Sequence, residues 1–144
     1  MTDPVTIVLL GRPTPSAQGS RGKNGFRFVP RRQTDAVAQI RAVASEAMRS
    51  REMLTGPLKI EFAAELPIPT NCSKKEQAAS MLGELNQTKR PDLKNLAALA
   101  EDALKTVVYP DDNQVCEHHN VKRYGVQPKI VMTVSQICST SPLI

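Results

Sequence analysis

Aromatic residues are scarce in this 144-residue sequence: tryptophan is absent, and aromatics make up 3% of the chain. A buried core must therefore consist mainly of valine, isoleucine, leucine, alanine and methionine. Cysteines are few as well, and Cys72, Cys116 and Cys138 form no C-x-x-C pair. We expect these three to be reduced thiols that pack as small core residues.

Long apolar runs are also missing. The longest, VTIVLL at residues 5–10, is far too short to span a bilayer. The first residues lack the charged and apolar regions of an export signal. These absences predict a cytoplasmic protein that does not enter a membrane.

The overall composition is that of a folded protein with an excess of positive charge. Hydrophobic residues make up 40% and charged residues 23%, and the length suits one domain covering 1–144 with a sizeable core. The formal net charge is +5 and the sequence pI is about 9.3. Such an excess suits a polyanionic partner or an anionic membrane surface.

Hydrophobic periodicity predicts alternating strands and helices. Strands are expected over residues 5–10, 58–66, 115–124 and 129–137. Helices are expected to start at Thr34, at the S-K-K-E capping box of residues 73–76, and at Pro91. The first should stop at Gly56-Pro57 and the second near Leu85. This order predicts an α/β (α+β) fold, a small mixed sheet with helices packed mainly on one face.

Residues 11–33 differ in character from the rest of the chain. They hold four glycines, three prolines and no acid, which predicts a long flexible loop with room for a short hairpin. Its six basic residues are Arg12, Arg21, Lys23, Arg27, Arg31 and Arg32. They could bind phosphates while Phe26 and Phe28 stack on exposed bases. The alternative is a solvated loop that the two phenylalanines attach to the core.

Acidic residues flank the third predicted helix. Asp92 lies at its start, and the pair Asp111-Asp112 follows it in a turn. Each has a simple structural interpretation, since aspartate favours both helix starts and Pro-Asp-Asp-Asn turns. If the chain doubles back after the helix, however, the pair returns to the helix start, and clustered carboxylates are what hard divalent cations bind.

Two further pairs of polar residues have defined places in this region. Asn95 and Asp102 are seven residues apart and line one polar ridge of the helix. His118 and His119 are neighbours in a predicted strand, so their side chains point to opposite faces. Joint metal binding by the two histidines is not expected, and surface or packing roles are favoured.

The ordered motifs resemble those of the RusA-type Holliday-junction resolvases (crossover junction endodeoxyribonucleases), a family common in bacteria and their phages. The matching residues are Arg90-Pro91-Asp92, Asn95-Leu96, Asp102-Ala103-Leu104, Asp111-Asp112, Gln114-Val115 and the run 121–125. Gly11-Arg12-Pro13, after the first predicted strand, also matches. The resemblance covers nearly the whole chain.

The resemblance implies a fold, a reaction and a set of site residues. A homodimer would use Mg²⁺, with Mn²⁺ as a plausible substitute, to cut two opposed strands of a four-way DNA junction. Asp92 and Asp112 would be the catalytic metal ligands with Asp111 beside them, and Asn95 and Asp102 would lie in an outer shell. In addition to the basic loop, Lys122 and Arg123 are a second candidate contact with DNA phosphates, on a predicted strand beside the acidic turn.

Two positions depart from the family pattern. Where the family has a second aspartate two residues after the first, this chain has Lys94, and Ala98 replaces a lysine found in some members. The Lys94 ammonium could point to solvent, neutralise the carboxylates and weaken Mg²⁺ binding, or contact a DNA phosphate. The alternative function is therefore a junction-binding protein whose nuclease activity is weakened or lost.

Overall fold

The computed structural model describes residues 2–16, 20, 21, 27, 28 and 30–138. The strands are β1 (Val5–Leu10), β2 (Ser20–Arg21), β3 (Arg27–Phe28), β4 (Leu58–Pro67), β5 (Val115–Gly125) and β6 (Lys129–Gln136). The helices are α1 (Arg31–Met48), α2 (Lys74–Met81), α3 (Leu93–Leu104) and the short 3₁₀ helix η1 (Asp112–Gln114). None of the helices in these described ranges is long and apolar enough to cross a membrane.

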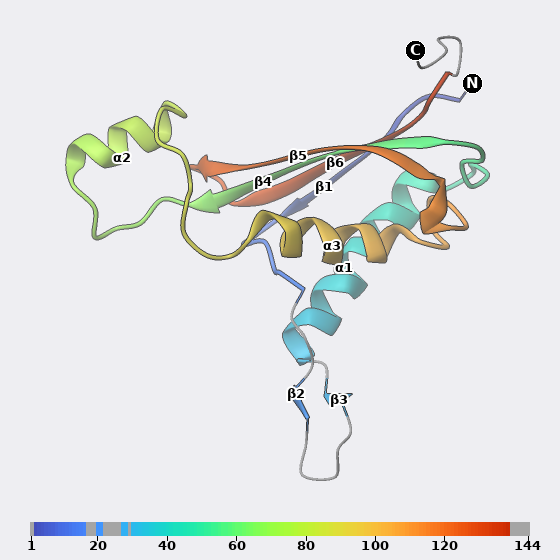
Figure 1. Cartoon of the computed structure of the whole chain (residues 1–144), viewed down its shortest axis with the longest axis horizontal. Coiled ribbons are helices and arrows are strands. Elements are labelled where there is room, and N and C mark those ends of the chain that lie inside the picture. The colour runs from blue at the N-terminus through green and yellow to red at the C-terminus, as the bar shows by residue number, and fades with distance from the viewer. Residues whose placement is uncertain (1, 17–19, 22–26, 29, 139–144) are drawn as a thin grey trace.

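Four strands form one mixed sheet in the order β1-β6-β4-β5 (Figure 1). β6 pairs antiparallel with both β1 and β4, whereas β4 and β5 are parallel. Parallel neighbours need a long crossover connection, and here it contains α2, α3 and η1. The predicted α+β fold with a small mixed sheet is confirmed. β2 and β3 pair separately as the short hairpin expected within residues 11–33.

One face of the sheet forms the core. Along β4, Leu58, Ile60 and Phe62 are buried, and the intervening Lys59 and Glu61 lie on the other face. α1 and α3 cover the buried face, and their apolar residues complete the core (Figure 1). α2 stands beyond the end of the sheet, and of its residues only Ser80 is buried.

Some predicted boundaries and one burial prediction were wrong. α1 begins at Arg31 after Pro30 and ends at Met48, well before Gly56. α2 ends at Met81 because Gly83, at φ 75°, takes the left-handed conformation that closes a helix. Pro91 precedes α3 and is not part of its first turn. The cysteines are free, but Cys116 and Cys138 are exposed and so are not core residues.

Arg41 of α1 holds the carboxyl end of α3 in place. Its guanidinium donates to the carbonyl oxygens of Ala103 (3.2 Å) and Lys105 (2.8 Å), and to the Thr106 hydroxyl (3.1 Å). A helix leaves its last carbonyls without internal partners, and this side chain satisfies two oxygens at that end. Thr106 has φ 67°, unusual for a β-branched residue, and it starts the turn that leads to Asp111 and Asp112.

We predict that Arg41→Ala lowers the free energy of unfolding by about 1–3 kcal/mol, because carbonyl groups at the end of α3 lose a charged donor. The matched control is Arg49→Ala, since Arg49 forms a surface ion pair with Glu46 in which the side chains are 81% and 74% exposed. That change should cost less than about 0.5 kcal/mol. Urea denaturation of the two variants checks this, and equal losses would contradict it.

Candidate functional site

The predicted acidic residues lie at the two ends of α3. Asp92 is the residue before the first turn, exposed and in an extended conformation, and its carboxylate makes no capping hydrogen bond. The helix therefore does not use this side chain as a hydrogen-bonding cap, although its position still suits the helix dipole. Its carboxylate is available to a ligand.

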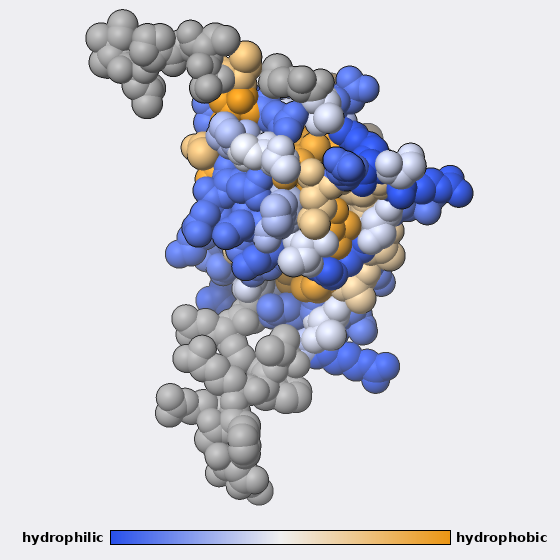
Figure 2. Space-filling model, turned by 90° about the vertical axis from the view of Figure 1, so that its right-hand side faces the viewer, coloured by the Kyte–Doolittle hydropathy of each residue, from blue (hydrophilic) through white to orange (hydrophobic). Residues whose placement is uncertain are grey.

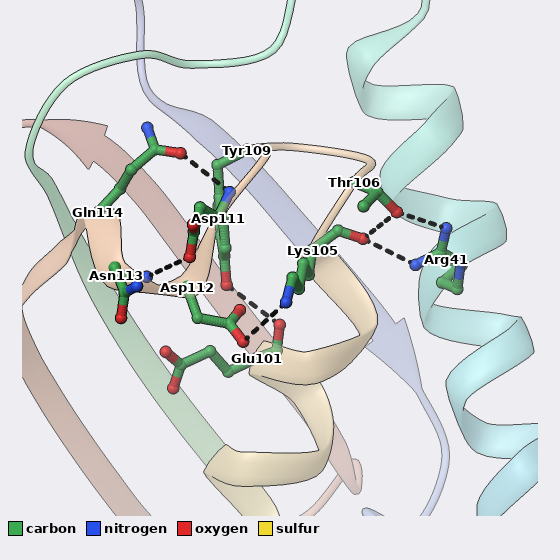
Figure 3. A network of polar contacts seen from close by, with 9 residues as sticks. All are labelled: Arg41, Glu101, Lys105, Thr106, Tyr109, Asp111, Asp112, Asn113 and Gln114. Carbon is green, nitrogen blue, oxygen red and sulfur yellow. Dashed lines mark hydrogen bonds and ion pairs between the residues drawn. The ribbon is translucent and has the colours of Figure 1, made fainter.

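Asp112 lies at the opposite end of α3, where the chain turns sharply before β5 (Figure 3). The buried Tyr109 donates its hydroxyl to the Glu101 carbonyl at 3.1 Å, which fixes the turn against the last part of α3. Lys105 Nζ then lies 3.7 Å from Asp112 Oδ2. The other oxygen, Asp112 Oδ1, is buried and has no hydrogen-bond partner among the described residues. An unsatisfied buried carboxylate oxygen is costly, and a cation can satisfy it.

Asp111 has a structural role that distinguishes it from its neighbour. Its carboxylate accepts from the Asn113 backbone N–H at 2.9 Å, and its own N–H donates to Gln114 Oε1 at 3.0 Å, a capping box at the start of η1. Gln114 Nε2 also donates to the carbonyls of Leu54 and Gly56, each at 3.1 Å. The turn interpretation therefore fits Asp111, whereas it does not account for Asp112.

Negative charge accumulates around Asp112. Burial raises the pKa of Glu101 above its ordinary value, His118 opposes that rise, and the charges of Asp112 and Asp102 add to it. Burial also raises the pKa of Asp102, with a further contribution from Asp112. The negative charge of Asp112 thus disfavours ionisation of both Glu101 and Asp102, and a bound cation would relieve this repulsion. His118 Nε2 lies 3.2 Å from Glu101 Oε2 and compensates only in part.

The expected return of the aspartate pair to the helix start is wrong within one chain. α3 has 12 residues and so extends about 18 Å, with Asp92 before its first turn and Asp112 beside Lys105 at its end. The turn after α3 keeps the pair at the carboxyl end. Within the described ranges, no three His, Cys, Asp or Glu side chains are arranged to hold a metal ion. The roles assigned to Asp92 and Asp112 stay predictions.

Lys122 and Arg123 do not form one grip, because they point to opposite faces of the sheet. Lys122 Nζ donates to the carbonyls of Lys89 (2.9 Å) and Pro91 (3.0 Å) and so supports the segment that leads into α3. Arg123 is exposed on the face opposite α3. His118 and His119 diverge as predicted, since only His118 lies on the helix side, against Glu101.

α3 carries three further predicted site residues. Lys94 is exposed and forms no ion pair with the acids in the described part of the chain, and its three predicted roles stay predictions. The carbonyl oxygen of Asn95 accepts from the Ser16 backbone N–H at 2.9 Å, which ties the segment after β1 to α3. Asp102 is exposed near the opposite end, one residue beyond Glu101.

The predicted basic residues are placed only in part. Arg12, Arg31 and Arg32 are exposed, and Arg31 lies 3.9 Å from Asp35. Lys23 and Phe26 lie outside the described residues, as do the side chains of Arg21, Arg27 and Phe28. The side of the molecule at which α3 ends presents hydrophilic residues over much of its described surface, with apolar residues between them (Figure 2).

Sequence reasoning missed two residues of this site. Glu101 was not singled out, and His118 was assigned a surface or packing role. Both belong to the charged group around Asp112. The only signal for Glu101 was its place next to Asp102, and the pairing with His118 depends on how α3 lies along β5, which the sequence does not reveal.

Comparison with known proteins identifies the family of this chain. Residues 11–135 match the family described as Endodeoxyribonuclease RusA. The chain is also 28% identical over 98 residues to YqaN of Bacillus subtilis (strain 168), which is described as an uncharacterized protein. The aligned region covers 67% of this chain and 69% of YqaN. The family match covers most of the chain and includes both ends of α3. This protein therefore belongs to the RusA endodeoxyribonuclease family, whose members are Holliday-junction resolvase-type nucleases.

Proposed function

We propose that this protein is a Mg²⁺-dependent endonuclease that resolves four-way DNA junctions in the cytoplasm as a homodimer. Membership of the RusA family supports the reaction class. The observation that carries the proposal is the state of Asp112, which has one buried oxygen without a partner among the described residues and two neighbouring carboxyl groups of raised pKa. Asp112, and not Asp111, is the ligand of the adjacent pair.

The donor groups fit a magnesium ion. Mg²⁺ keeps several waters and is usually held by one or two protein carboxylates together with substrate phosphates, so a cage of three protein ligands is not required. Asp92 and Asp112 would hold it, and Mn²⁺ could substitute. When bound, the ion supplies an acidified water and charge stabilisation for phosphodiester hydrolysis. Glu101 and Asp102 add negative charge near Asp112 at the carboxyl end of α3, and the Lys105 ammonium offsets part of that charge.

A single subunit does not bring its own Asp92 to its own Asp112, since the 12 residues of α3 lie between them. We therefore place the two ligands of one site on different subunits. A two-fold axis can set the two α3 helices antiparallel. Asp112 of each subunit then lies toward Asp92 of the partner subunit, so the same pairing occurs twice in the dimer. The dimer would then have two composite sites, which matches the two symmetric cuts that a four-way junction needs.

DNA binding is assigned to the basic residues. Arg12, Arg31 and Arg32 are exposed. They belong to the basic stretch of residues 11–33, which also contains Arg21, Lys23 and Arg27 and which contacts α3 through the hydrogen bond from Ser16 to Asn95. Lys94 is exposed beside Asp92 and is suited to a phosphate near the cleaved bond. Arg123 adds a cation on the other face of the sheet. Lys122 contributes through its support of the segment before α3.

A second candidate function rests on Lys94. Because an exposed cation occupies a position two residues from Asp92, it could weaken Mg²⁺ binding there and leave a junction-binding protein with little or no nuclease activity. The two candidates share the fold and the DNA, and they differ in whether the wild-type protein cleaves.

The first prediction for this function concerns the aspartate pair. Asp112→Asn should reduce cleavage of a synthetic four-way junction by at least about 100-fold, because a ligand carboxylate is lost. Asp111→Asn is the matched control: asparagine is an equally good capping residue, so activity should stay within a few-fold of wild type. Cleavage is measured with Mg²⁺ at equal junction occupancy. Equal activity of both variants would overturn the metal assignment.

Composite sites predict complementation between two inactive variants. In a mixture of Asp92→Asn and Asp112→Asn subunits, half of the dimers formed by random exchange are mixed, and each mixed dimer has one site with both native aspartates. Nicking of one junction strand should therefore return in the mixture, while each variant alone stays inactive. If no nicking returns although mixed dimers form, both ligands of a site come from the same subunit.

A third prediction concerns Lys94. Replacing it by aspartate adds a carboxylate beside Asp92 and removes a positive charge, so the Mg²⁺ concentration for half-maximal cleavage should fall several-fold. Lys94→Gln removes only the charge and should give an intermediate value. A titration of cleavage rate against Mg²⁺ measures both. Identical titrations for all three proteins would make Lys94 a bystander, and cleavage by the aspartate variant alone would favour the second candidate function.

A further inference from the structure

β5 is an edge strand whose outer side has no strand beside it in the described part of the chain. The sheet order places it next to β4 alone, and its 11 residues make it the longest strand described. No further backbone-to-backbone hydrogen bond reaches residues 116–125 from the described residues. A long edge with free backbone groups is a template for pairing with another strand unless it is covered, bulged or blocked by like charges.

The charges on this edge are arranged so that β5 is complementary to itself. Glu117 and Arg123 are both exposed, lie on the same face of the sheet and form no ion pair within the described ranges. If two copies of β5 pair antiparallel about a two-fold axis at Asn120, Glu117 of each faces Arg123 of the other. Opposite charges directly across a strand pair are stabilising.

Neighbouring registers do not give this complementarity. Side chains that face each other lie on the same side of the sheet, so the axis must pass through a residue position. With the axis at His119, Glu117 would face Val121. With the axis at Val121, Arg123 would face His119 and Glu117 would face Gly125. Only the register centred on Asn120 forms two salt bridges between opposite charges.

We infer that the free edge of β5 is the surface through which two copies of this chain associate, antiparallel and centred on Asn120, so that their four-stranded sheets become one continuous sheet. This inference rests on the proposed function in that it supplies the homodimer which the proposed function requires. It adds the surface, the register and the residues that fix them: Glu117 and Arg123.

This register also explains how the ends of two α3 helices could meet. His118 contacts Glu101 near the end of α3, and Lys122 contacts the Pro91 carbonyl just before its start. In the proposed pairing His118 faces Lys122 of the partner subunit. The end of one α3 is therefore brought to the level of the start of the other, so Asp112 lies on the side of Asp92 of the partner subunit.

Charge reversal tests the surface. Glu117→Arg places two arginines opposite each other twice in the dimer, and Arg123→Glu does the same with two glutamates. Each single variant should raise the dimer dissociation constant at least about tenfold at low salt, because two attractive pairs become repulsive. Glu52→Arg, the same charge change at an exposed position outside β5, should leave the constant within about twofold. Analytical ultracentrifugation measures the constants.

Mixing the two single variants is the decisive measurement. In the mixed dimer, the arginine introduced in one subunit would face the glutamate introduced in the other, and the native Arg123 would face the native Glu117. Affinity should therefore return to near that of the wild type, and the variant that carries both substitutions should also recover. Single variants that dimerise as well as wild type, a mixture that does not recover, or a wild-type protein that stays monomeric would each overturn the inference.

Junction cleavage by the same samples separates this inference from the proposed function. A wild-type protein that follows the charge-reversal pattern but never cleaves would contradict the nuclease and leave the β5 surface intact. A protein that cleaves, and loses cleavage in Asp112→Asn, while its dimer ignores charge reversal, would contradict the β5 surface alone. Thermal unfolding of each variant confirms that the fold is retained.

Discussion

The parallel pairing of β4 with β5 is the constraint on which the arrangement of the acidic residues depends. Because parallel neighbours cannot be joined by a tight turn, the chain must leave the end of β4 and return to the start of β5. α3 makes that return beneath the sheet, antiparallel to β5, and the turn from Thr106 to Asp111 completes it. One motif residue is thereby left at each end of a rigid helix.

Side-chain contacts at the carboxyl end of α3 hold this turn in place. Arg41 reaches it from α1, Tyr109 is fully buried with its hydroxyl on Glu101, and Gln114 fixes η1 to the segment before β4. These contacts come from three parts of the chain. Among the described residues of the turn, Asp112 is the carboxylate that keeps a buried oxygen without a hydrogen-bond partner. These contacts fix the turn where we propose that a cation binds, and such fixing lowers the cost of assembling its ligands.

Local patterns predicted the elements well and their arrangement in space less well. Alternation along residues 58–66 gave β4, and Gly83 could have marked the end of α2, because left-handed glycines close helices. The position of Asp112 could not be derived in this way. Its place depends on Tyr109 packing under α3, and aspartates suit both a cap and a metal site. The sequence motif therefore identified which residues to examine, while the direction of the return after α3 needed coordinates.

The division of roles between Asp111 and Asp112 follows from their geometry. A capping carboxylate must lie close to the backbone N–H groups of its own turn, and Asp111 meets that requirement together with Gln114. The next side chain along the chain then points away from the cap, toward Lys105 and the end of α3. A site that needs a carboxylate there gains from an aspartate that fixes the turn just before it. In the proposed site, the adjacent pair is thus one ligand with its support. Because the 12 residues of α3 separate Asp92 from Asp112 within one subunit, we propose that a second copy of the chain supplies the second ligand.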